Sequence, residues 1–103
     1  MVVTLLFFDG CPNWQITDAR LEALSAEFGF DFDRCHVETD EDAQRLHFRG
    51  SPTVLIDGRD VFAAGDETVG LSCRMYRTEH GIAGAPSVVQ LREALTAADI
   101  KRV

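Results

Sequence analysis

Cys11 holds the most informative position among the three cysteines, the residues of this chain best suited to chemistry. It stands in "FFDGCPNW", residues 7–14, after an apolar run and directly before Pro12. Because proline suits the first turn of a helix, Cys11 is predicted to lie at a helix N-terminus, where unpaired N–H groups and the helix dipole favour a thiolate. Asp9 would oppose this effect if its carboxylate pointed the same way. The alternative is a buried structural cysteine.

The position three residues after Cys11 is held by Trp14 rather than by a second cysteine. A tryptophan cannot resolve a mixed disulfide, so exchange between two neighbouring cysteines is not expected here. Trp14 begins an apolar stripe at helical spacing that continues through Leu21, Leu24 and Phe28, and this favours core packing over stacking on a substrate.

The remaining thiol and imidazole groups form no metal-ligand pattern. Cys35 alternates with Val37 on a predicted strand and is expected to be inert core. His36, His47 and His80 show no ligand spacing with one another or with the cysteines, so no metal site is predicted.

Hydrophobic periodicity and turn signals predict an α/β fold in the order β-α-β-α-β-β-α. Asp57-Gly58 is the pair that a type I′ hairpin turn prefers, and Ser87 with Gln90 forms a capping box for the last helix. Residues 63–86 show no clear element and are expected to be a long loop, which in a compact domain is usually functional. The predicted elements are strands over 2–8 and 30–37, a hairpin over 51–62, and helices from Pro12 to Gly29, over 39–46 and from Ser87 onward.

Size and charge limit the classes of function. The chain has 103 residues, one domain's worth, and a formal net charge of −7 with no basic run, which argues against nucleic acid and anionic membranes as partners. The apolar run over 2–8 is too short for a membrane span and lacks a basic leader. Three cysteines are too few for a secreted disulfide scaffold, so a cytoplasmic protein is expected. As to its assembly, we expect a monomer or a weak dimer.

Two motifs give this chain a resemblance to the thioredoxin-like superfamily. "GCPNW" lies where those proteins keep a Cys-x-x-Cys site, and Pro52 in "RGSPTVLIDG" matches their cis-proline. The resemblance covers nearly all of a single domain over residues 1–103, with 63–86 as an insertion. It implies a central four-stranded mixed sheet flanked by helices, Cys11 as nucleophile, and backbone groups of Ser51 open to an extended peptide or glutathione. The alternative for Pro52 is a trans-proline at a strand start.

The topology of that sheet bears on where Cys73 lies relative to Cys11. The hairpin turn at Asp57-Gly58 would lie at the end of the sheet far from Cys11, so the chain after Phe62 would emerge at the same end as Cys11. Cys73 is then predicted to approach Cys11, as a resolving cysteine or a second soft-metal ligand. The equally weighted alternative is a packed turn in which Cys73 and Tyr76 join a satellite core.

Two arginines follow Cys73. Arg74 and Arg77 are candidates to counter Asp9 or to hold a carboxylate such as that of glutathione, against the more common alternative of a solvated loop face. The surrounding "LSCRMYRTEHGIAGAPS" loosely resembles small bacterial thioredoxin-like proteins that are sometimes grouped with organomercurial lyases.

Three functions are therefore expected in competition. The first is monothiol redox chemistry without a bound cofactor, in which Cys11 forms mixed disulfides with a protein or glutathione. Cys73 or an outside thiol such as glutathione resolves them, and the substrate is bound by Trp14, Ser51, Pro52 and Arg74. The second is a binding module that retains the scaffold without the chemistry. The third is soft-metal or organomercurial chemistry by Cys11 and Cys73, with Asp9 or Asp66 as proton donor.

Overall fold

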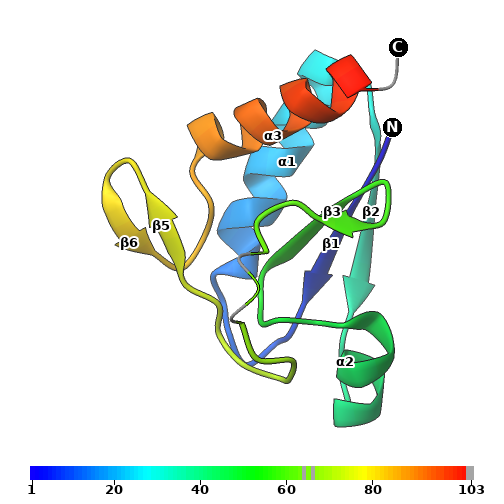
Figure 1. The fold of residues 1–103 in the computed structure, drawn as a ribbon, viewed down its shortest axis with the longest axis vertical. Coiled ribbons are helices and arrows are strands. Elements are labelled where there is room, and N and C mark those ends of the chain that lie inside the picture. Colours follow the sequence, from blue (N-terminus) through cyan, green and yellow to red (C-terminus); the bar gives the residue numbers. More distant parts are fainter. Residues whose placement is uncertain (64, 66, 102–103) are drawn as a thin grey trace.

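A four-stranded mixed sheet with helices on both faces forms the body of the protein (Figure 1). The computed structural model describes residues 1–63, 65 and 67–101. The strand order is β2-β1-β3-β4, with β1 parallel to β2 and antiparallel to β3. The strands are β1 Val2–Phe7, β2 Asp31–His36, β3 Thr53–Ile56 and β4 Arg59–Asp60, and the helices are α1 Trp14–Phe28, α2 Asp40–Leu46 and α3 Val88–Lys101.

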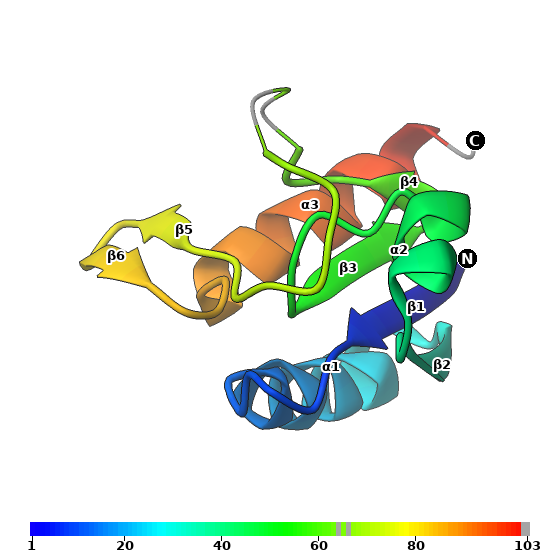
Figure 2. The same cartoon turned by 90° about the horizontal axis from the view of Figure 1, so that it is seen from below.

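Two hydrophobic clusters cover the two faces of the sheet. Helices α1 and α3 lie side by side on one face (Figures 1 and 2), where Leu21 and Leu91 pack against Val3 and Leu5 of β1. On the other face, Leu6 of β1 packs with residues of α2 and its flanks. Because β1 is covered on both sides, its sequence is apolar at every position except Thr4, as expected of a central strand.

Local signals fix most of the element boundaries. Helix α1 ends at Gly29, whose φ of 76° is the left-handed cap conformation. Helix α2 begins where the Asp42 N–H donates to Thr39 Oγ1, and α3 begins with the reciprocal bonds of Ser87 and Gln90. The order of three helices around a mixed four-stranded sheet is confirmed. Among the described residues no helix has the length and apolarity to cross a membrane.

The expectation that residues 63–86 lack any regular element is wrong. This segment contains a small antiparallel hairpin of β5, Tyr76–Thr78, and β6, Gly81–Ala83, which stands apart from the main sheet (Figure 2). Strands of three residues are too short to produce a detectable alternation of apolar and polar side chains. The preceding strand β4 also ends earlier than expected, at Asp60 rather than Phe62.

Candidate functional site

A disulfide joins Cys11 to Cys73 across 62 positions of sequence, with their Cα atoms 5.5 Å apart. Cys11 lies in the turn after β1, where its N–H donates to Phe8 O at 3.1 Å, and it precedes α1 as the sequence indicates. Cys73 lies in the chain between β4 and β5. The predicted approach of Cys73 to Cys11 is therefore confirmed, although Trp14 holds the position that a neighbouring cysteine would have.

The two bonded cysteines differ in their access to solvent. Cys11 keeps 1% of its accessible surface, whereas Cys73 is exposed. Cys35 is a free, half-buried cysteine that packs against the second hydrophobic cluster. Only the Cys11–Cys73 pair thus combines two thiols within bonding distance, one protected and one open.

The Ser51–Pro52 peptide bond is cis and lies beside this disulfide. The Ser51 N–H donates to Ser72 O at 2.8 Å, and the Arg74 N–H donates to Ser51 O at 3.0 Å. The backbone groups of Ser51, expected to be open to a partner, are bonded instead to the chain's own residues 72–74. The expectation of an open edge at Ser51 is not met, because the segment that carries Cys73 occupies it.

Gly50 permits this close approach. Its φ of 103° lies in the region that favours glycine, and a Cβ placed there would come within 3.0 Å of Arg74 Cβ and 3.3 Å of the Arg74 backbone. Glycine is therefore required on both conformational and steric grounds.

Arg74 is buried rather than solvated, so the expected solvated loop face is wrong for this residue. Its guanidinium donates to Asp60 at 2.8 and 3.2 Å and to Thr53 Oγ1 at 3.2 Å, and Glu67 lies 3.9 Å away. Burial alone would lower the pKa of Arg74, but the hydrogen bond and charge of Asp60 raise it above its ordinary value, so the guanidinium stays charged. Its role in binding a substrate carboxylate remains a prediction.

Tyr76 anchors the same segment from the other side. Its hydroxyl donates to Pro52 O, and its ring meets Phe62 edge-on at 5.6 Å. Burial raises the pKa of Tyr76. Residues 72–76, which we term the Cys73 segment, are thus held to Ser51–Pro52 by backbone pairing and a tyrosine hydroxyl, and to β4 by a buried ion pair.

Trp14 is half-buried and packs against the α1–α3 core, as its position on the apolar stripe favours. Its ring stacks on Phe7 at 4.2 Å, and Phe7 stacks on His36 at 4.9 Å. His36 in turn contacts Asp9 at 3.0 Å and Glu38 at 3.1 Å. The carboxylate of Asp9 is therefore engaged with His36.

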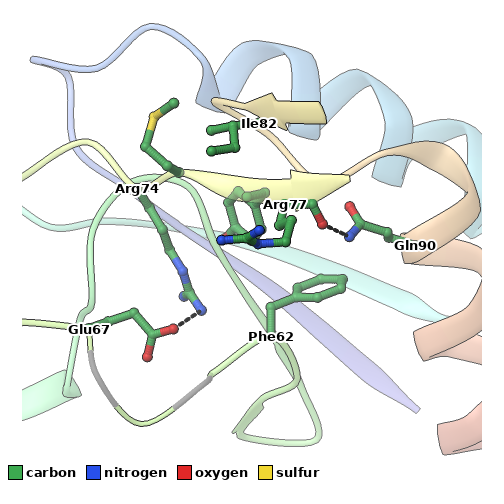
Figure 3. Close-up of a pocket in the computed structure, with 8 residues that line it drawn as sticks. Phe62, Glu67, Arg74, Arg77, Ile82 and Gln90 are labelled. Carbon is green, nitrogen blue, oxygen red and sulfur yellow. Dashed lines mark hydrogen bonds and ion pairs between the residues drawn. The ribbon is translucent and has the colours of Figure 1, made fainter. Parts of the chain in front are cut away.

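A pocket of about 380 Å³ lies next to the Cys73 segment, between β5–β6 and the chain after β4 (Figure 3). No local sequence pattern predicts this pocket, because its walls come from separate segments of the chain. Its lining residues are Phe62, Glu67, Arg74, Met75, Tyr76, Arg77, Ile82 and Gln90.

Among the described residues, no group of three or more histidine, cysteine or acidic side chains is arranged so that it could hold a metal ion. Asp66, a predicted proton donor, lies outside the described residues. The arrangement can form and break one disulfide, and it places a cis-proline and an ion-paired anchor around that bond.

Comparison with known proteins returned no matching family model, no matching curated protein and no matching solved structure.

Proposed function

We propose that this protein carries out thiol–disulfide exchange through the Cys11–Cys73 pair on a thioredoxin-like scaffold. In one direction, two partner thiols reduce the disulfide and leave as a partner disulfide, while Cys11 and Cys73 become thiols. In the other direction the same atoms return the two electrons. The partners are glutathione or another small thiol, or a cysteine of a protein, as the sequence predicts.

One observation carries this proposal: a protected and an exposed cysteine are bonded to each other beside a cis-proline. The first of them stands between the central strand and α1, where a helix N-terminus favours a thiolate. The order of elements and Ser51–Pro52 support the thioredoxin-like comparison. Cys73 supplies the second thiol from a distant segment, because Trp14 holds the position three residues after Cys11 where thioredoxin-like proteins keep their second cysteine.

A purely structural disulfide is the main competing explanation. Closing a loop of this length would stabilise the fold by about 4 kcal/mol in the chain-entropy description. The reduction potential separates the two roles, because structural disulfides have potentials below about −300 mV and exchange-active ones lie above.

The test is a redox titration in glutathione buffers, with free thiols counted by maleimide mass shift. We expect reversible two-electron behaviour with a potential above about −300 mV. Cys35→Ser should leave the intramolecular two-electron transition unchanged, while Cys11→Ser and Cys73→Ser should each abolish that transition and leave only mixed disulfides with glutathione. A potential below that limit would contradict exchange.

The other two functions make different predictions for the same variants. A binding module would retain its partner affinity in Cys11→Ser, and soft-metal chemistry would show stoichiometric mercury binding that depends on both Cys11 and Cys73. Neither has a specific observation in its favour, since the described residues contain no further ligand cluster.

A further inference from the structure

The two bonded cysteines differ in exposure as whole residues, and exchange chemistry depends on access to them. A thiolate attacks one sulfur of a disulfide and displaces the other, so the sulfur that can be reached becomes the site of the mixed disulfide. Cys11 keeps only 1% of its surface, while Cys73 is exposed.

Neighbouring segments close the approach to Cys11. The Cys73 segment covers the Ser51 edge with two backbone hydrogen bonds, and Ser51 itself is fully buried. Beyond the β5–β6 hairpin, the chain also packs on the start of α1: a Cβ at Gly84 would meet Asn13 Nδ2 at 2.0 Å. Asn13 is two residues from Cys11, so this contact lies close in sequence to the buried cysteine.

The approach to Cys73 is open by comparison. Residue 73 is exposed, and the next residues form one wall of the 380 Å³ pocket, together with Phe62 and Ile82 (Figure 3). This volume is within the range of small-molecule sites. Cys73 does not itself line the pocket, but a small thiol bound there would lie beside the residues that directly follow Cys73, without pairing to the backbone of Ser51.

We propose that Cys73, and not Cys11, is the cysteine that exchanges with the partner, and that the partner is a small thiol such as glutathione. The partner thiolate forms a bond to Cys73 Sγ, the Cys11–Cys73 bond breaks, and Cys11 leaves as a thiolate at the N-terminal end of α1. A second partner thiolate attacks the partner sulfur of this mixed disulfide, releasing the partner disulfide and the Cys73 thiolate. This order reverses the one predicted from the sequence, and it rests on the proposed exchange function.

The test locates the first adduct on the native protein. Oxidised protein is mixed with glutathione, quenched with acid at successive times, capped with maleimide and digested with trypsin. The arginines of the chain place Cys11 in residues 1–20, Cys35 in 35–45 and Cys73 in 60–74, so each adduct has its own peptide. Extrapolation to zero time removes later transfer of glutathione between the two cysteines.

We expect glutathione on the 60–74 peptide in excess over the 1–20 peptide by on the order of tenfold at zero time, because access governs the attack. Adduct mainly on residues 1–20 would overturn this inference while leaving the exchange function intact. Absence of adduct from both peptides, with the disulfide unreduced, would overturn the exchange function itself.

A second measurement covers single-cysteine variants. In a Cys35→Ser background, Cys11→Ser leaves Cys73 as the sole thiol and Cys73→Ser leaves Cys11. With oxidised glutathione we expect the protein that retains Cys73 to form a mixed disulfide faster by roughly tenfold. Equal rates in two folded variants would contradict the protected position of Cys11.

Discussion

Asp60→Asn should weaken the anchor of the Cys73 segment more than any exposed charge substitution. Asp60 is 8% exposed and faces Arg74, which is 3% exposed, at 2.8 Å, with Arg49 at 3.6 Å. Removing the carboxylate charge leaves the buried guanidinium with Glu67, 3.9 Å away, as its acidic neighbour among the described residues, together with its hydrogen bond to Thr53 Oγ1. Loss of one partner from a buried pair costs about 3 kcal/mol.

Urea unfolding followed by the fluorescence of Trp14, the single tryptophan, measures this loss. With a slope of about 1.5 kcal/mol per molar, the midpoint should fall by about 2 M. Asp18→Asn is the matched control, because its partner Arg34 is 42% exposed and also contacts Glu22; its cost should stay below about 1 kcal/mol. Equal losses in the two variants would refute the assignment of Asp60 and Arg74 as a buried anchor.

The double variant Asp60→Asn/Arg74→Met sharpens the result. It should lose less stability than the two single changes added together, because Arg74→Met removes the charge that Asp60→Asn leaves unpaired. The redox titration provides an independent readout. If the anchor keeps Cys73 near Cys11 in the reduced protein, Asp60→Asn should favour the dithiol form, and an unchanged potential would show that the ion pair does not position Cys73.

Four further outcomes are expected. Tyr76, the single tyrosine, should not ionise near its ordinary pKa of 10.0 in the folded protein, as followed by absorbance at 295 nm. Because the pKa of Tyr76 is raised in the folded protein, its contribution to the free energy of unfolding is complete below pH 10 and is lost as the pH rises above 10. Gly50→Ala should destabilise the oxidised protein by about 1–3 kcal/mol in urea unfolding, and by more than Gly58→Ala, where no atom of the described residues lies within 4 Å of the added Cβ. Thr17→Val should leave stability unchanged or raise it by about 1 kcal/mol, because the buried Thr17 hydroxyl has no hydrogen-bond partner in the part of the chain that the structure describes. Arg77→Gln should slow exchange with glutathione by about twofold and leave exchange with cationic cysteamine unslowed, since this exposed side chain lines the pocket near Cys73; equal slowing of both thiols would contradict an electrostatic role.

The elements that the sequence predicts correctly are those whose signals are local. The apolar run of β1, the Asp57-Gly58 turn and the Ser87 capping box each act within a few residues, so they can be recognised without knowledge of the tertiary structure. The approach of Cys73 to Cys11 is one of two equally weighted expectations from the sequence. It rests on the strand directions that the resemblance implies, because these determine the end of the sheet at which the chain after Phe62 emerges.

What the sequence did not reveal depends on contacts between distant residues. Arg74 appears as an ordinary loop arginine until Asp60 and Thr53 are seen around it. The pairing of the Ser51 backbone cannot be predicted from the sequence, because the segment that bonds to it begins 21 positions further along, at Ser72. No periodicity of the sequence links the two. The burial of Cys11 beside an exposed Cys73 likewise emerges only from packing.

The 62-residue separation of Cys11 and Cys73 also has a mechanical consequence. When bonded, the two residues turn most of the sheet and two of the helices into a covalent ring that tension on the chain ends cannot open. At about 3.4 Å per extended residue, oxidation therefore removes roughly 200 Å from the greatest length to which the polypeptide can be drawn. An enzyme that pulls this chain through a narrow pore would meet a single extended polypeptide when the two cysteines are reduced. When they are oxidised, it would meet a covalently closed loop that must pass the pore as more than one strand.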